Sequence, residues 1–284
     1  MSVPRALWAV FLLHPRGGEP PQDAFPPAAA PLEIRLNEQA DWGCALEDAR
    51  RVCAAAAGEL WRYFPGRRLP PLRIDPQGGP IVLFGRSPNG EIRVRLAVHG
   101  TYWAQMTYQF AHEFCHILCN YRDNPNPNKW FEESVCETAS LFVLRRSAQT
   151  WRTRPPYPHW KDYAGALEKY AEERIRKARL PAGMTPAAWY RENAEALARN
   201  ATDRDRNTTA ATVLLPLFER SPEHWEAVGA LNSGTFDAST TFPRYLESWL
   251  LHAAEPRRTF IREVAATFGI PLPAPLKGPD RRPP

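Results

Sequence analysis

The amino-acid sequence predicts an α+β fold, in which a small N-terminal sheet with one helix against it precedes a mainly α-helical part. Segments in which apolar and charged residues alternate, the pattern of half-buried strands, end before Gly100. Beyond that point apolar residues recur at helical spacing. The chain has 284 residues, of which 44% are hydrophobic, so it can bury a sizeable core and wholesale disorder is excluded.

The N-terminal third supplies the predicted sheet. Four segments are predicted strands, namely residues 32–36, 72–74, 81–84 and 91–98. The last one alternates most clearly, with Ile92 and Val94 on one face and Arg93 and Arg95 on the other. A Pro-Asn-Gly sequence at 88–90 precedes it and is typical of a hairpin turn. One helix is predicted at residues 45–64, where the following Pro-Gly ends it.

The rest of the chain is predicted to be helical. The predicted helices span residues 102–122, 130–147, 160–178, 185–199, 208–219, 222–232 and 243–268. We therefore expect a catalytic core at 32–150 and a helical C-terminal subdomain at 151–270. Residues 271–284 are Pro-rich and charged, which predicts a disordered tail.

The composition limits the partners of the protein. Its net charge of +5 is spread over interspersed acids and bases, which is not the basic stripe of a nucleic-acid-binding protein. No apolar run is long enough to span a membrane. Residues 1–31 are Pro- and Ala-rich, and are either a degenerate signal peptide or a disordered leader. A signal peptide would place the protein outside the cytoplasm.

The helix predicted at 102–122 contains the motif HExxH, formed by His112, Glu113 and His116. Residues four apart lie on one face of a helix, so both imidazoles can reach one metal ion. Glu113 is rotated by about 100° from His112 and can meet a water ligand of the metal instead. Two histidines four apart also occur as a solvated pair, so the motif requires support from elsewhere in the chain.

That support comes from the next predicted helix. A zinc site with two histidines needs a third protein ligand, commonly a carboxylate, and Glu133 follows His116 by 17 residues. A second helix that returns antiparallel would bring Glu133 beside the first. Glu137 shares its face and can orient a ligating imidazole through a hydrogen bond. Glu132 is interpreted as an ordinary acid in the first turn of a helix.

These residues resemble the gluzincins, the zinc metallopeptidases that include thermolysin-like and aminopeptidase-like enzymes. Residues 130–137 are similar to the W-x-N-E-G-x-A-E segment of that clan, with Glu132, Ser134 and Cys136 as departures. The resemblance covers residues 91–147 and implies a zincin-like fold, in which the strand at 91–98 is the edge strand above the cleft. No G-x-M-E-N motif precedes the helix, so recognition of a free N-terminus is not expected.

The resemblance implies a function and a set of roles. His112, His116 and Glu133 would bind Zn²⁺, Glu113 would be the catalytic base, and Glu137 would orient one histidine. The expected activity is hydrolysis of peptide bonds in a peptide or protein substrate. Gluzincins also stabilise the oxyanion with a downstream Tyr or His. The candidates are Tyr190, which we favour, Tyr163, His159 and His224.

Two other functions and the state of the cysteines stay open at this point. The chain can be a non-catalytic zincin-fold protein that binds zinc or a peptide, or a basic module that binds an acidic partner. Cys44 with Cys53, and Cys119 with Cys136, can form disulfides in an exported protein, or stay buried thiols. Cys115 and Cys119 are interpreted as packing residues of the motif-bearing helix.

Overall fold

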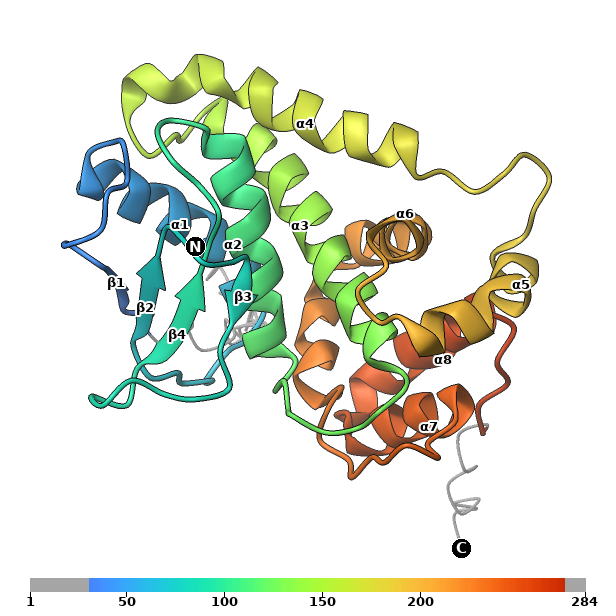
Figure 1. The fold of residues 1–284 in the computed structure, drawn as a ribbon. Coiled ribbons are helices and arrows are strands. Elements are labelled where there is room, and N and C mark those ends of the chain that lie inside the picture. The colour runs from blue at the N-terminus through green and yellow to red at the C-terminus, as the bar shows by residue number, and fades with distance from the viewer. Residues whose placement is uncertain (1–30, 274–284) are drawn as a thin grey trace, which may run out of the picture.

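The computed structural model describes residues 31–273, and the α+β prediction is confirmed. A four-stranded sheet lies on one side, α2 and α3 cross the middle, and further helices continue beyond α3 (Figure 1). The predicted leader at 1–31 and tail at 271–284 lie outside the described residues, apart from residue 31 and residues 271–273.

The sheet has the order β1-β2-β4-β3. Its strands are β1 (Ile34–Leu36), β2 (Leu72–Asp75), β3 (Ile81–Val82) and β4 (Ile92–Arg95). β1, β2 and β4 are parallel, and α1 (Leu46–Trp61) connects the first two. The apolar residues of β2 and β4 are fully buried and alternate with partly exposed polar or charged ones, so one face of the sheet packs on the core.

The prediction that 91–98 is an edge strand is wrong. β4 pairs with β2 on one side and with β3 on the other, so the edge strand is β3. The reason is the hairpin, in which the turn that ends at Gly90 lays β3 antiparallel along the edge of β4 that β2 leaves free. The hairpin itself was predicted from the sequence, but which strand forms the edge depends on the long-range pairing of β2 with β4.

Two long helices form the centre of the molecule. These are α2 (Trp103–Leu118) and α3 (Lys129–Trp151), and they run antiparallel, because Ser140 of α3 contacts Tyr108 near the start of α2 while Glu132 contacts His116 near its end. α2 ends four residues earlier than predicted, where Asn120 adopts a left-handed conformation with φ 56°.

The C-terminal helices surround α3. They are α4 (Ala164–Lys177), α5 (Pro186–Arg199), α6 (Arg204–Arg220), α7 (Phe242–His252) and α8 (Arg258–Thr267), with 3₁₀ segments η1 (Pro158–Tyr163), η2 (Pro222–Ala230) and η3 (Glu255–Arg257). Buried residues from α1 to α8 form one continuous hydrophobic cluster. Among residues 31–273, no helix is both long and apolar enough to cross a bilayer.

Two of the predicted C-terminal helix boundaries are wrong. The single helix expected at 243–268 is divided into α7 and α8, because the backbone is extended at Ala253 and Pro256 cannot continue a helix. The helix expected at 208–219 begins earlier, at Arg204, because Asp203 caps its N-terminus by accepting a hydrogen bond from the backbone N–H of Arg206 at 3.1 Å.

Phe131 tests whether α3 and the C-terminal helices unfold as one unit. Its fully buried ring contacts the rings of Phe242, Tyr245, Trp249 and Phe268. Phe131→Ala should lower the free energy of unfolding by about 3–5 kcal/mol because it leaves a cavity. The measurement is urea denaturation, with Leu251→Ala, an exposed position on α7, as the control. Two separate transitions would contradict a shared core.

Candidate metal centre

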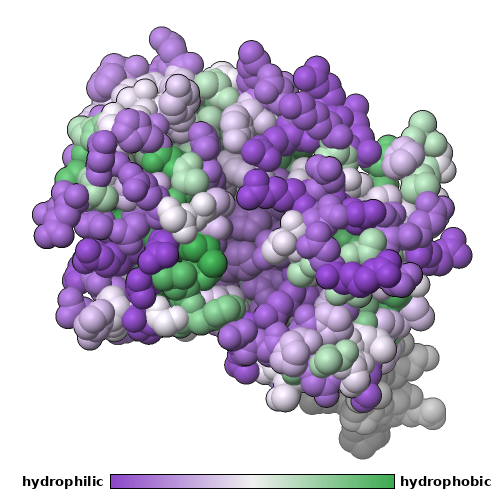
Figure 2. All heavy atoms as spheres, viewed as in Figure 1, coloured by the Kyte–Doolittle hydropathy of each residue, from purple (hydrophilic) through white to green (hydrophobic). Residues whose placement is uncertain are grey.

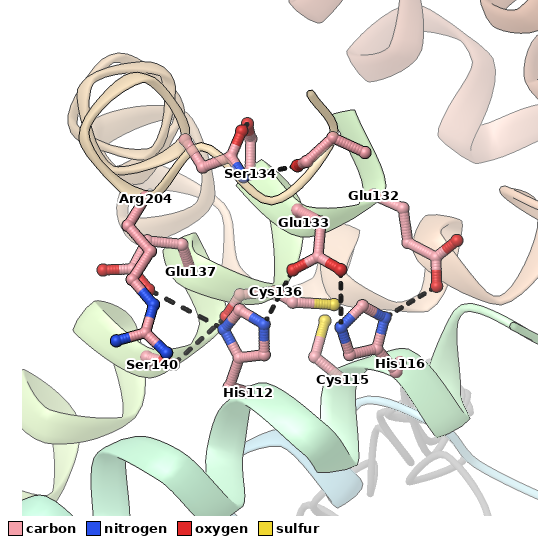
Figure 3. A network of polar contacts seen from close by, with 12 residues as sticks. His112, Cys115, His116, Glu132, Glu133, Ser134, Cys136, Glu137, Ser140 and Arg204 are labelled. Atoms are coloured by element: carbon pink, nitrogen blue, oxygen red, sulfur yellow. Dashed lines mark hydrogen bonds and ion pairs between the residues drawn. The ribbon is translucent and has the colours of Figure 1, made fainter. Parts of the chain in front are cut away.

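The two histidines of the motif lie on one face of α2, as their spacing requires. Phe110, Phe114 and Ile117 occupy the buried face of the same helix and anchor it in the core. The imidazole rings of His112 and His116 are 5.0 Å apart between centroids. Their Nε2 atoms point to α3, where Glu133 lies between them (Figure 3).

Glu133 brings the third donor group to the two imidazoles. One carboxylate oxygen lies 3.1 Å from Nε2 of His112, and the other lies 3.6 Å from Nε2 of His116. One donor atom from each of the three residues lies within 4.8 Å of the others. Ligands at about 2.0–2.1 Å from a tetrahedral zinc ion are separated by about 3.3 Å, so these donors fit such an ion. The structure therefore brings together the three residues that the sequence singles out.

The Nδ1 atoms of the two imidazoles face two further carboxylates of α3. Nδ1 of His112 lies 3.7 Å from Glu137, which is the residue expected to orient a histidine. Nδ1 of His116 lies 2.7 Å from Glu132. Glu132 lies in the first turn of α3, as the sequence predicts, but its side chain is buried against His116 and not exposed to solvent. Each imidazole thus has its own orienting carboxylate.

A buried chain of hydrogen bonds extends from Glu132 into the C-terminal helices. The amide of Asn232 donates to Glu132 at 2.8 Å, and the hydroxyl of Tyr245 donates to Asn232 at 2.9 Å. Asn232 and Tyr245 are 3% and 0% exposed, which leaves water little access to the chain. Hydrogen bonds in such surroundings hold their partners in one orientation, so this chain fixes Glu132 toward His116.

Glu137 is supported on the opposite side of the site. It accepts hydrogen bonds from the hydroxyls of Tyr108 and Thr208. Arg174 of α4 donates to the Tyr108 hydroxyl at 3.0 Å, and its guanidinium lies 3.8 Å from the centre of that ring. Sequence patterns did not reveal Tyr108, Arg174, Asn232 or Tyr245, because they belong to elements that meet only in the folded chain.

The imidazoles and carboxylates of the centre shift one another's pKa values. Burial lowers the pKa of His112, but its hydrogen bonds to Glu133 and Glu137 outweigh this and raise it to about 9. The pKa of His116 is raised in the same way by Glu132 and Glu133. Burial opposes ionisation of Glu133, yet the two imidazoles hold its pKa well below the usual range. Without a metal, these shifts favour an anionic Glu133 between protonated imidazoles.

Glu113 differs from the other glutamates of the centre. It is 4% exposed and, in the part of the chain that the structure describes, forms no ion pair. Burial raises its pKa, while the neighbouring imidazoles and the backbone amide of Val82 in β3 lower it to a smaller extent. Glu113 lines the same cavity as the triad, so it is a carboxylate that can exchange a proton with a molecule bound there.

The centre lies at the bottom of a cavity of about 680 Å³. Edge strand β3 forms one wall, α2 and α3 form the floor, and α4 with α6 form the far wall. Figure 2 shows the corresponding hollow, which is lined mostly by hydrophilic residues and bordered on the sheet side by an apolar patch. A cavity of this size, open to solvent, can admit part of an extended chain.

The four residues proposed to stabilise an oxyanion lie elsewhere, and none lines the cavity. Tyr190 packs among the aromatic residues around Trp130, 5.7 Å from its ring, and burial raises its pKa to about 12. The Tyr163 hydroxyl accepts a hydrogen bond from the backbone of α2. His159 and His224 stack on other rings. The positions of these four residues in the sequence gave no information on whether their side chains would face the cavity.

The cysteines form no disulfide, since all five are free thiols. Cys115, Cys119 and Cys136 meet between α2 and α3 behind the centre, with 3.9 Å between the first two sulfur atoms. Three such thiols can also hold a soft metal ion. They are fully buried and do not line the cavity, so they cannot take part in chemistry there.

Comparison of the chain with protein-family models, with curated proteins and with solved structures finds no match. The function is therefore inferred from the geometry and chemistry of the centre itself.

Replacing Glu132 tests its role beside His116. Glu132→Gln should weaken metal binding by about 10–100-fold, because the imidazole loses the carboxylate that fixes its orientation. Competition with a chromogenic chelator measures the change. The control is Glu223→Gln, since Glu223 is an exposed acid in the first turn of η2. Equal metal affinity of the two variants would show that Glu132 is an ordinary helix-start residue.

The paired imidazoles predict a pH dependence. The folded-state pKa of His112 is about 9, raised from 6.5, so the protonated pair stabilises the metal-free protein below pH 6.5. This stability should be lost as the pH rises from 6.5 through 9, whereas metal affinity should increase because the metal binds neutral imidazole. Melting temperatures with and without metal measure both effects. A metal-free melting temperature that is constant over this interval would contradict the pairing.

Proposed function

We propose that the protein is a zinc-dependent hydrolase that cleaves peptide bonds, similar to the gluzincins. The observation that carries the proposal is the convergence of His112, His116 and Glu133, with the unpaired carboxylate of Glu113 beside them in one cavity. Structural zinc sites use four protein ligands, whereas catalytic sites use three and leave a position open. Three donors at the bottom of a cavity correspond to the second kind.

Zinc at this centre would supply a Lewis acid that polarises a carbonyl group and acidifies water. In this proposal Glu113 would take the proton from the attacking water and deliver it to the leaving nitrogen. Its raised pKa suits a group that must both accept and release a proton. Glu132 and Glu137 keep both imidazoles turned to the centre.

The arrangement of the elements also supports a zincin-like fold. The helix with the motif is followed by an antiparallel helix with the third ligand, and an antiparallel edge strand borders the cavity. That strand is β3, at the place where the resemblance leads us to expect a substrate-pairing strand. Ile81 of β3 is 45% exposed and Phe84 beyond it is 54% exposed, which leaves apolar surface beside the metal centre.

Replacing the base tests the mechanism. Glu113→Gln should retain one zinc ion per chain and lose hydrolysis of casein by about 10²–10⁴-fold or more, because only proton transfer is removed. Zinc content is measured by elemental analysis. Glu59→Gln, a buried glutamate on α1 outside the cavity, is the control and should retain activity.

The outcomes separate this function from the alternatives. Full activity of Glu113→Gln would reject the mechanism. A wild-type protein that holds zinc and cleaves no peptide would favour a non-catalytic zincin-fold protein. If the gently purified protein contains no zinc and cannot bind it, the proposed metal centre is rejected. The remaining alternative is then a basic module that binds an acidic partner.

A further inference from the structure

The charges that line the cavity are distributed unevenly around the metal centre. All four lining acids, Glu113, Glu132, Glu133 and Glu137, belong to the centre itself. The lining cations are Arg122, Lys129, Arg174 and Arg204. The four negative and four positive side chains cancel in formal charge. A bound divalent metal ion with neutral imidazoles would therefore give the cavity a net positive charge. A cleft lined by charge of one sign concentrates molecules of the opposite sign.

Three of the four cations are available to a bound molecule. Arg174 is not available, because it donates hydrogen bonds to the hydroxyls of Tyr108 and Tyr170. The Tyr108 hydroxyl in turn donates to Glu137. Within residues 31–273, neither Arg122, Lys129 nor Arg204 forms an ion pair with an acid of the protein. The side chains of Arg122 and Arg204 are exposed.

The available cations lie on both sides of the triad. Arg204, the first residue of α6, lies one turn before Thr208, whose hydroxyl contacts Glu137 on the His112 side (Figure 3). Lys129 is the first residue of α3, one turn before Glu133, and α3 begins on the His116 side. Arg122 follows the end of α2 on that same side. A chain that crosses the centre therefore meets positive charge before and after the reacting bond.

Apolar surface beside the centre favours a polypeptide as the bound chain. The exposed ring of Phe84 stacks on Tyr121 at 5.5 Å, and the ammonium group of Lys129 lies 5.9 Å from the centre of the Phe84 ring. A polypeptide can combine apolar contacts with carboxylates along one strand.

We propose that the substrate is an extended polypeptide with acidic side chains on both sides of the scissile bond. Arg204 binds a carboxylate on the His112 side, and Lys129 with Arg122 binds one on the His116 side. This proposal rests on the proposed function, since it names the substrate class of the same cavity.

The test uses internally quenched peptides that are identical except for the residues flanking the scissile bond. These are glutamate, glutamine or lysine on either side. For the metal-loaded protein, kcat/KM for the glutamate peptide should exceed that for the glutamine peptide roughly tenfold, and that for the lysine peptide by more. High salt should reduce this preference because it screens exposed charges.

Charge reversal locates the two subsites. Arg204→Glu and Lys129→Glu should each reduce the preference for glutamate on its own side only. The matched control is Arg244→Glu, since Arg244 is also an exposed residue in the first turn of a helix, outside the cavity. A glutamate is favourable in all these first turns, so the variants should fold.

The possible outcomes distinguish failure of this substrate proposal from failure of the proposed hydrolase function. Cleavage of the glutamate and lysine peptides at equal kcat/KM would overturn it and leave the hydrolase intact. If Arg204→Glu lowers kcat equally for all three peptides, Arg204 acts on the reacting bond instead, which also overturns its role as a carboxylate subsite. If no peptide is cleaved, the proposed function fails. In that case fluorescence anisotropy measures binding of the same peptides. Tighter binding of the glutamate peptide would support the acidic preference, and equal binding of all three peptides would overturn it.

Discussion

The antiparallel packing of α2 on α3 is the constraint on which the proposed metal centre depends. It places Glu133 against both Nε2 atoms, while the carboxylates one position before it and four positions after it meet the two Nδ1 atoms. A shift of one residue along α3 would rotate each of these side chains by about 100° around the helix. The same helix is anchored on its other faces by the hydrophobic core, so the register of the two helices and the arrangement of the candidate ligands are set together.

The concentration of buried charge is tolerable because most of the buried ionisable groups have a partner of opposite charge. Burying an isolated carboxylate is costly, but here three of the four glutamates face imidazoles, and Glu137 also accepts hydrogen bonds from Tyr108 and Thr208. Glu113 is the exception, and burial raises its pKa accordingly. The glutamates of the centre thus fall into two groups. Glu132, Glu133 and Glu137 face imidazoles, which favour the anionic forms of the latter two, whereas Glu113 has no such partner among the described residues and burial favours its protonated form.

Local patterns in the sequence predicted what depends on local spacing. The i,i+4 histidines, the shared face of Glu133 and Glu137, and the hairpin before β4 all follow from the periods of helices and strands. Pairings across the fold could not be predicted in this way. The local sequence around Glu132 is that of an exposed first-turn acid. Its contacts with His116 and Asn232, which come from distant parts of the chain, are what bury it. Tyr190 had a suitable distance along the chain, but α5 directs it into an aromatic cluster.

The hydrogen bonds from Tyr245 through Asn232 to Glu132 make the distant C-terminal helices part of the architecture of the centre. The first 150 residues contain every proposed metal ligand, yet they lack the groups that restrain one of the orienting carboxylates. Grafting α2 and α3 alone onto another scaffold would transfer the ligands without this restraint, and the ring of His116 could then turn away. A minimal version of this centre therefore has to include the chain as far as α7.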